Sequence, residues 1–190
     1  MKDLVILFDF FGVVGVEIAP TWLMKHLPKE EALEIKEQIF QRADRGDIDE
    51  MEAFTELSKY SNQDPLEVKA EWEEAYKIDS EVVEYLKELR KDHKVYLLSN
   101  AIGSMLHRIL DNNNLNELFD KKFISSEIAL IKPSTDFFNY VINDLSIDSQ
   151  SAVMIDDNPE NIEGAKATGL KGIVYRGVDD LREQIKKLEG

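Results

Sequence analysis

The stretch LVILFDFFGVVGVE, residues 4–17, places one acid, Asp9, near the end of a run of apolar residues. Leu4–Phe10 is rich in branched and aromatic side chains, which is typical of a buried strand. Gly12 and Gly15 follow and end the pattern. Parallel sheets bind ligands beyond the carboxyl ends of their strands, so Asp9 is the first residue that we expect in a functional site.

Four more apolar runs predict strands, and amphipathic patterns between them predict helices. These strands are Val95–Leu98, Phe123–Ile124, Ala152–Ile155 and Gly172–Tyr175. Residues with helix-capping side chains precede the helical patterns, namely Asp79, Asn100, Ser134 and Asn158. Strands that alternate with helices in this way are parallel and joined by crossover helices. The sequence therefore predicts an α/β fold with an open, Rossmann-like parallel sheet.

The segment between the first and second strands has helical patterns but no strand signal. Apolar residues at helical spacing predict helices around residues 32–43, 51–57 and 68–76, and Pro20 marks the exit of the chain from the core. The segment is too long for a plain crossover connection. We therefore expect an α/β core of residues 1–15 and 79–190, with a small helical cap subdomain of residues 16–78 inserted after the first strand.

The composition narrows the classes of partner. The 190 residues carry a formal net charge of −15 and no cysteine. Such an acidic surface repels nucleic acid and anionic membranes, so neither is an expected partner. The lack of cysteine, of long apolar runs and of a targeting segment fits a cytoplasmic protein. An anionic substrate needs a cation or a local positive pocket to bind here, and the oligomeric state is left open.

Polar residues occur at the ends of four predicted strands or shortly after them. They are Asp9, the pair Ser99 and Asn100, Lys132, and the acids Asp156 and Asp157, with Asn161 one helical turn later. Each of them alone is explained by turn or capping chemistry. Because the carboxyl ends of parallel strands share one edge of the sheet, their joint occurrence predicts a functional site at that edge.

Converging carboxylates repel one another unless a hard cation joins them, and Mg²⁺ is the usual cation in an oxygen-only site. Its charge also lets a phosphate approach an acidic protein. We expect Lys132 and the Ser99 hydroxyl to hold phosphoryl oxygens, helped by backbone N–H groups after Asp9 and after Ser99. Asp9 then attacks phosphorus in line, and water hydrolyses the resulting aspartyl phosphate.

Four motifs, in this order, resemble those of the haloacid dehalogenase superfamily. They are ILFDFFGVV (6–14), VYLLSNA (95–101), IALIKP (128–133) and VMIDDNPENIEGAKATGL (153–170). The insertion resembles that family's helical cap of the first type. The segments RADRGDIDEMEAF (42–54) and SSEIALIKPSTDFFNYV (125–141) resemble, more narrowly, glucose-1-phosphate phosphatases and the N-terminal phosphatase domain of soluble epoxide hydrolase. The resemblance implies a Mg²⁺-dependent phosphatase that acts on a small phosphorylated substrate.

The resemblance also implies a role for each candidate residue. Asp9 matches the nucleophile, and Ser99 and Lys132 match the catalytic residues that orient the phosphoryl group. The implied phosphate- or substrate-binding positions are Gly12, Ser99, Asn100 and Lys132. The implied metal ligands are Asp9, the Phe11 carbonyl, Asp157 and, through a bound water, Asp156, with Asn161 supporting them.

The residue two positions after Asp9 departs from the family pattern. The family's phosphatases usually carry a second Asp there, which protonates the leaving oxygen and then activates water, whereas this chain has Phe11. General acid–base catalysis is worth about 10²–10⁴-fold, so we expect slow or specialised turnover that favours aryl, acyl or anomeric sugar phosphates. Phe11→Asp should then accelerate hydrolysis of alkyl phosphates more than of aryl phosphates. Glu17, near the entry to the cap, is one candidate for a substitute proton donor.

The aromatic residue at position 11 is also compatible with functions other than a phosphatase. Haloacid dehalogenases of the superfamily carry an aromatic residue at this place, but they lack the acid pair that this chain keeps as Asp156 and Asp157. Phosphonoacetaldehyde hydrolases use a cap lysine, and the spacing of the cap lysines here singles none out. A non-catalytic module that keeps the fold and the phosphate site is the third alternative.

Overall fold

The computed structural model describes residues 4–189, so residues 1–3 and 190 of the predicted core lie outside the described residues. Its centre is a sheet of five parallel strands in the order β3-β2-β1-β4-β5. The strands are β1 (Val5–Phe8), β2 (Lys94–Ser99), β3 (Lys121–Ile124), β4 (Ala152–Asp156) and β5 (Lys171–Val174). The predicted open α/β sheet is confirmed.

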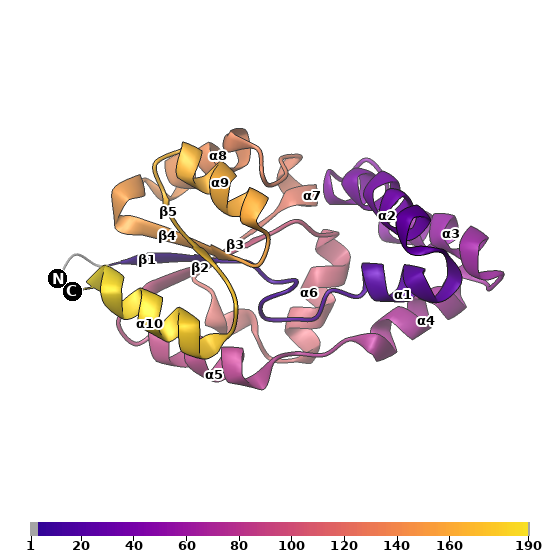
Figure 1. The fold of residues 1–190 in the computed structure, drawn as a ribbon, viewed down its shortest axis with the longest axis horizontal. Helices are drawn as coiled ribbons and strands as arrows, with labels where there is room; N and C mark the ends of the chain where they lie inside the picture. Colours follow the sequence, from indigo (N-terminus) through magenta and orange to yellow (C-terminus); the bar gives the residue numbers. More distant parts are fainter. Residues whose placement is uncertain (1–3, 190) are drawn as a thin grey trace.

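Helices cover both faces of the sheet (Figure 1). The core helices are α5 (Ser80–Leu89), α6 (Gly103–Asn112), α7 (Ser125–Ile128), α8 (Thr135–Leu145), α9 (Pro159–Ala167) and α10 (Val178–Glu189). Successive strand residues point to opposite faces: Ile6 and Phe8 pack in the layer of α5, α6 and α10, and Leu7 packs in the layer of α8 and α9. Among the described residues, no helix is long and apolar enough to cross a membrane.

Three of the four predicted capping residues begin core helices. The prediction for Asn100 is wrong, because the N-cap position of α6 is Ile102, which makes no side-chain cap hydrogen bond, and the Asn100 side chain bonds the backbone of Lys132 instead. The Asp79 carboxylate accepts hydrogen bonds from the backbone of Glu81 and Val82 at the start of α5. Ser134 caps α8, and Asn158 caps α9 directly after β4. These caps satisfy backbone N–H groups that have no partner inside the helix. They therefore fix where the chain turns at the carboxyl edge of the sheet.

Four helices between β1 and α5 lie beyond the carboxyl edge of the sheet (Figure 1). They are α1 (Ala19–His26), α2 (Lys29–Asp44), α3 (Glu50–Ser61) and α4 (Pro65–Ala75). The sequence patterns predicted the last three but not α1. Pro20, interpreted as a marker of the exit from the core, lies in the first turn of α1. Proline is tolerated there because the first-turn N–H groups have no helical acceptor.

The two chain segments that enter and leave these four helices run side by side. The Val16 N–H donates to the Lys77 carbonyl over 3.0 Å, and the Asp79 N–H donates to the Val14 carbonyl over 2.9 Å. Gly15 and Ile78 form an antiparallel bridge between these contacts. This paired connection supports the division at residues 15/16 and 78/79, which we keep as a proposal.

A buried acid at the start of α3, Glu50, ties the cap to the core. Its carboxylate accepts a 2.7 Å hydrogen bond from Ser104 Oγ and is paired with the guanidinium of Arg108, both on α6. Lys69 of α4 approaches it from the cap side at 3.0 Å. Burial raises the pKa of Glu50, but the hydrogen bonds from Arg108, Ser104 and Lys69 outweigh burial and lower the pKa to about 2.

We expect Glu50→Gln to lower the free energy of unfolding by about 1–3 kcal/mol at pH 7, because Arg108 loses a charged acceptor. Since the pKa of Glu50 is lower in the folded than in the unfolded chain, its stabilisation is fully present above about pH 4.5 and is lost as the pH falls toward 2. Urea unfolding of both proteins between pH 7 and pH 2.5 tests this. The stability difference between them should shrink as the pH falls, and a constant difference would contradict it.

Candidate active site

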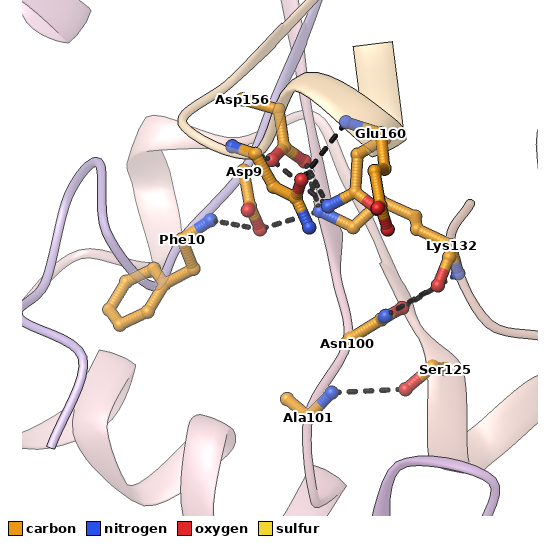
Figure 2. Close-up of polar contacts among 10 residues, drawn as sticks. Asp9, Phe10, Asn100, Ala101, Ser125, Lys132, Asp156 and Glu160 are labelled. Carbon is orange, nitrogen blue, oxygen red and sulfur yellow. Dashed lines mark hydrogen bonds and ion pairs between the residues drawn. The ribbon is translucent and has the colours of Figure 1, made fainter. Parts of the chain in front are cut away.

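Three predicted residues meet at the carboxyl edge of the sheet (Figure 2). Lys132 Nζ lies 2.8 Å from Asp9 Oδ1 and donates a 2.6 Å hydrogen bond to Asp156 Oδ2. Asp9 follows β1, Asp156 ends β4, and Lys132 lies in the loop after α7. Their exposed fractions are only 6% for Asp9, 3% for Lys132 and 0% for Asp156. The site is therefore a buried cation between two carboxylates.

Burial and charge act in opposite directions on these groups. Burial raises the pKa of Asp9 well above its ordinary value and Asp156 adds to the rise, whereas Lys132 opposes it. Burial lowers the pKa of Lys132, but the carboxylates of Asp9 and Asp156 outweigh burial and raise the pKa above its ordinary value. Lys132 therefore keeps its positive charge in this site.

The two acids after β4 differ in how they are held. Asp156 accepts hydrogen bonds from Lys132, from the Asn158 N–H at 2.9 Å and from Asn161 Nδ2 at 3.0 Å to each oxygen. Asp157 is exposed, and among residues 4–189 no side chain forms a hydrogen bond or ion pair with its carboxylate. Burial raises its pKa, and the charges of Asp156 and Glu17 add to the rise. Asp156 is thus locked in place, whereas no described side chain holds Asp157.

The acids at this edge fit a divalent cation. One carboxylate oxygen from each of Asp9, Asp156 and Asp157 lies within 4.8 Å of the other two. An oxygen-only donor set of this size suits Mg²⁺. The Asp157 carboxylate, which no described side chain holds, is the best placed to contact a metal directly. The Asp156 oxygens already accept hydrogen bonds from Lys132, Asn158 and Asn161, so Asp156 is better placed to orient these residues.

Gly12 contributes space to the site. Its φ of +83° is a left-handed conformation that glycine adopts without strain, and a Cβ there would lie 2.4 Å from Asp157 Oδ2. Its N–H donates to the Gly15 carbonyl at 2.7 Å, and the Phe10 N–H donates to Asp9 Oδ1 at 2.7 Å. These two backbone donors, expected to face a phosphate, are used inside the loop in this structure. Gly12 therefore lets the loop and Asp157 lie in direct contact.

The pair after β2 splits into two different roles. Ser99 is fully buried, and its Oγ has no hydrogen-bond partner among the described residues. Asn100 bonds the backbone of Lys132 twice at 2.9 Å, accepting from the N–H and donating to the carbonyl (Figure 2). The next N–H, that of Ala101, donates to Ser125 Oγ at 3.0 Å. Asn100 therefore positions Lys132. Ser125, which sequence patterns did not single out, accepts the hydrogen bond of the Ala101 N–H, one of the backbone donors expected to bind phosphate.

A cavity of about 260 Å³ lies between the cap helices and this edge of the sheet. Asp9, Lys132 and Asp157 line it from the core. Its lining also includes aromatic and apolar side chains, namely Phe11, Ile18, Phe40, Trp72, Ile102 and Met105. From the cap side, polar residues that line it are Glu17, Lys36 and Asp44. The candidate site therefore combines a charged floor with a largely apolar wall.

Phe11 and Trp72 belong to that wall. The Phe11 ring makes edge contacts with Phe10, at a centroid distance of 5.2 Å, and with Tyr76 at 6.1 Å. Trp72 stacks on Phe40 at 5.6 Å and is almost fully buried. Aromatic contacts of this kind hold rings in fixed orientations. Trp72 is therefore part of the core of the cap, and its ring also borders the cavity.

The fold and the site together define an α/β protein whose reactive groups are carboxylates beneath a helical insertion. The chain belongs to the haloacid dehalogenase-like hydrolase family, whose sequence model matches residues 25–175. This confirms the resemblance at the level of the family and assigns the chain to a family of hydrolases. The narrower resemblance to glucose-1-phosphate phosphatases and the epoxide hydrolase phosphatase domain stays a prediction.

The chain matches curated relatives of different lengths. The chain is 26% identical over 160 residues to drimenol cyclase drtB of Aspergillus calidoustus, a match that covers 80% of this chain but 30% of the cyclase. It is 24% identical over 156 residues to a D-ribitol-5-phosphate phosphatase of Bacteroides thetaiotaomicron, covering 77% of this chain and 76% of the phosphatase. The chain thus spans less than a third of the cyclase and most of the phosphatase.

Solved structures share the whole fold. A haloacid dehalogenase family enzyme of Bacteroides thetaiotaomicron superposes with a TM-score of 0.80 at 20% identity, covering 97% of this chain and 99% of that one. The complex of that enzyme with magnesium and inorganic phosphate gives a TM-score of 0.74 at 22% identity, covering 92% and 94% of the two chains. The helical insertion is therefore part of the shared architecture.

Proposed function

We propose that this protein is a Mg²⁺-dependent phosphatase that cleaves a small phosphorylated metabolite through an aspartyl-phosphate intermediate. The observation that carries the proposal is the buried Asp9–Lys132–Asp156 group, of which Asp9 and Lys132 line the cavity, with the Asp157 carboxylate beside it. The D-ribitol-5-phosphate phosphatase and the neighbour solved with magnesium and inorganic phosphate support the same reaction class.

Asp9 is the nucleophile of the proposed reaction. Asp9 Oδ1 is held by the Phe10 N–H and by Lys132, and no protein group among residues 4–189 bonds Oδ2. Oδ2 is therefore the oxygen that attacks phosphorus, while the ester oxygen leaves in line. Water then cleaves the acyl phosphate, which releases inorganic phosphate and restores the Asp9 carboxylate.

Lys132 and Ser99 are the protein groups that bind the phosphoryl oxygens in this proposal. The Lys132 ammonium supplies a fixed positive charge in a buried site, where charge acts strongly. The Ser99 hydroxyl is a buried donor that has no hydrogen-bond partner within residues 4–189. Asp9, Asp157 and the Phe11 carbonyl would hold Mg²⁺, with Asp156 acting through a bound water, and the cation when bound offsets the charge of the carboxylates and the phosphate.

The cavity wall favours an ester with an apolar or aromatic organic group. Phe11, Phe40, Trp72 and Met105 present apolar surface to a cavity of about 260 Å³, and burying such surface stabilises a bound ligand by roughly 25 cal/mol per Å² before ordering costs. Since the Phe11 side chain has no ionisable group, aryl and acyl phosphates and anomeric sugar phosphates, whose leaving groups need the least protonation, are the preferred substrates of this proposal unless another residue supplies the proton.

The test is hydrolysis of p-nitrophenyl phosphate and of a panel of phosphorylated metabolites, with Mg²⁺ and with EDTA. We expect release of phosphate that requires Mg²⁺ and a hydroxylamine-labile phosphoenzyme on Asp9, identified by mass spectrometry after acid quenching. Absence of phosphate release from every ester would overturn the proposal. Tight phosphate binding without turnover would support the non-catalytic module instead.

The aromatic side chain of Phe11 favours one other reaction, hydrolytic dehalogenation, because a halide leaves without being protonated. The acid pair Asp156 and Asp157 opposes this reaction, since a halide needs no cation in the site. Chloride release from 2-chloropropionate in EDTA, with no hydrolysis of phosphate esters, would favour the dehalogenase.

Ser99→Ala should lower activity without lowering the stability of the fold. Removing a buried hydroxyl that lacks a partner leaves the free energy of unfolding unchanged or raises it by up to about 1 kcal/mol. The same change removes a phosphate donor, which lowers kcat/KM by about 10–10²-fold. Urea unfolding and steady-state kinetics measure the two effects. A large loss of stability would contradict the assignment of Ser99 to the substrate.

A further inference from the structure

The proposed reaction needs a proton donor that Phe11 does not supply. Two acids line the cavity from the cap side, Glu17 and Asp44. Glu17 is paired with the Lys36 ammonium, which also lines the cavity. Among residues 4–189, no hydrogen bond or ion pair reaches the Asp44 carboxyl. Asp44 is therefore the cap acid that is free to meet a substrate.

We propose that Asp44 is the general acid–base of this enzyme, an inference that rests on the proposed phosphatase activity. As Asp9 attacks phosphorus, the ester P–O bond breaks with its electron pair on oxygen, and that oxygen takes the Asp44 proton and leaves as an alcohol. Asp44 then accepts a proton from the water whose oxygen bonds to phosphorus, and Asp9 departs as a carboxylate. The cycle ends with Asp44 protonated again.

The core fixes the position of Asp44. Asp44 is the last residue of α2, and α2 contacts α7 of the core. Two residues later Gly46 lies directly against Ser126 of α7, since a Cβ on Gly46 would come within 2.6 Å of the Ser126 carbonyl oxygen. Ser126 Oγ also accepts the Gly103 N–H at 2.9 Å. One short helix thus holds both the end of α2 and the segment that follows β2.

The surroundings of Asp44 suit a group that both gives and takes a proton. Burial raises the pKa of Asp44 to about 7; Lys36 and Lys132 oppose the rise, and Glu17 adds to it. The negative end of the α2 dipole also disfavours a carboxylate in the last turn. An acid with a pKa near neutrality is an efficient general acid–base at physiological pH.

Two acids on the helices that pack against α2 form ion pairs with residues other than Asp44. From α3, which packs against α2, Glu50 is bound to Arg108. From α7, Glu127 is paired with His107 at 2.7 Å. Lys132, which pairs with Asp9, is among the groups whose charge acts on Asp44. The Asp44 and Asp9 carboxyls line the same cavity, and the positive charge of Lys132 acts on both.

The experiment compares wild type, Asp44→Asn, Glu17→Gln and Asp47→Asn on phosphate esters of graded leaving-group pKa, with Mg²⁺ present. Asp47 is the matched control, because it is an exposed acid three residues after Asp44, in the loop that follows α2, and does not line the cavity. Asp44→Asn should lower kcat/KM by about 10²-fold for alkyl phosphates and by less than about 3-fold for p-nitrophenyl phosphate. It should also remove the fall in kcat/KM for alkyl esters above about pH 7. Asp47→Asn should leave both measurements unchanged.

A double variant gives a second readout. If Asp44 supplies the proton, the acceleration of alkyl ester hydrolysis by Phe11→Asp should be larger in the Asp44→Asn protein than in wild type, since only there is the acid missing. Unchanged leaving-group dependence and pH profile in Asp44→Asn, beside an active wild type, would overturn the role of Asp44 alone. Their loss in Glu17→Gln instead would transfer the role to Glu17. A wild type that hydrolyses no phosphate ester would overturn the proposed function as well.

Discussion

Asp9→Asn is expected to lower phosphatase kcat by at least about 10⁴-fold and to abolish the phosphoenzyme, because an amide does not attack phosphorus and nothing else in the site replaces it. The fold should survive. Burial raises the pKa of Asp9, so its charge is costly where it lies, and Asn keeps the shape of the side chain. Lys132 retains Asp156 as an ion-pair partner at 2.6 Å.

Rates with p-nitrophenyl phosphate, acid-quenched mass spectrometry and thermal unfolding check this expectation together. Asp136→Asn is the matched control, because Asp136 is an exposed acid in the first turn of α8, away from the cavity. It should keep wild-type kinetics. Retention by Asp9→Asn of more than a tenth of wild-type activity, with the fold intact, would rule out Asp9 as the nucleophile.

The residues of the core part of the site could be predicted from sequence because topology alone brings them together. Ser99 and Asp156 end strands of a parallel sheet, Asp9 directly follows one, and all such ends lie at one edge. Lys132 follows β3 after the short helix α7, so the topology places it near the same edge of the sheet. No knowledge of side-chain packing was needed to place these residues near one another.

The cap part of the site could not be predicted in this way. Asp44 lies on a helix whose pattern showed which face is apolar, but where that helix sits over the sheet depends on tertiary contacts such as Gly46 against Ser126. The link between Glu50 and Arg108 joins residues 58 positions apart and leaves no periodic signal. The first cap helix, α1, was missed because Pro20 was interpreted only as a break, although proline is favoured in a first turn.

Lys132→Met should have the largest effect on stability of any single change in the site. The buried ammonium is 2.8 Å from Asp9 Oδ1 and 2.6 Å from Asp156 Oδ2. Methionine fills similar space but leaves two buried carboxylates without their cation, which costs about 3–5 kcal/mol of unfolding free energy. Lys121→Met is the control, because its pair with Asp144 is exposed and worth at most about 1 kcal/mol.

Mg²⁺ and a second substitution show whether that cost is electrostatic. If unpaired charge causes the loss, Mg²⁺ should raise the thermal unfolding temperature of Lys132→Met more than that of wild type, since a ligand of the native state stabilises it by linkage. The double variant Lys132→Met/Asp156→Asn removes one of the two buried carboxylates that have lost their cation. In EDTA it should recover a large part of the unfolding free energy lost in Lys132→Met. Equal Mg²⁺ responses together with no recovery in the double variant would mean that Lys132 acts through packing. The charge balance inferred among Asp9, Lys132 and Asp156 would then be wrong.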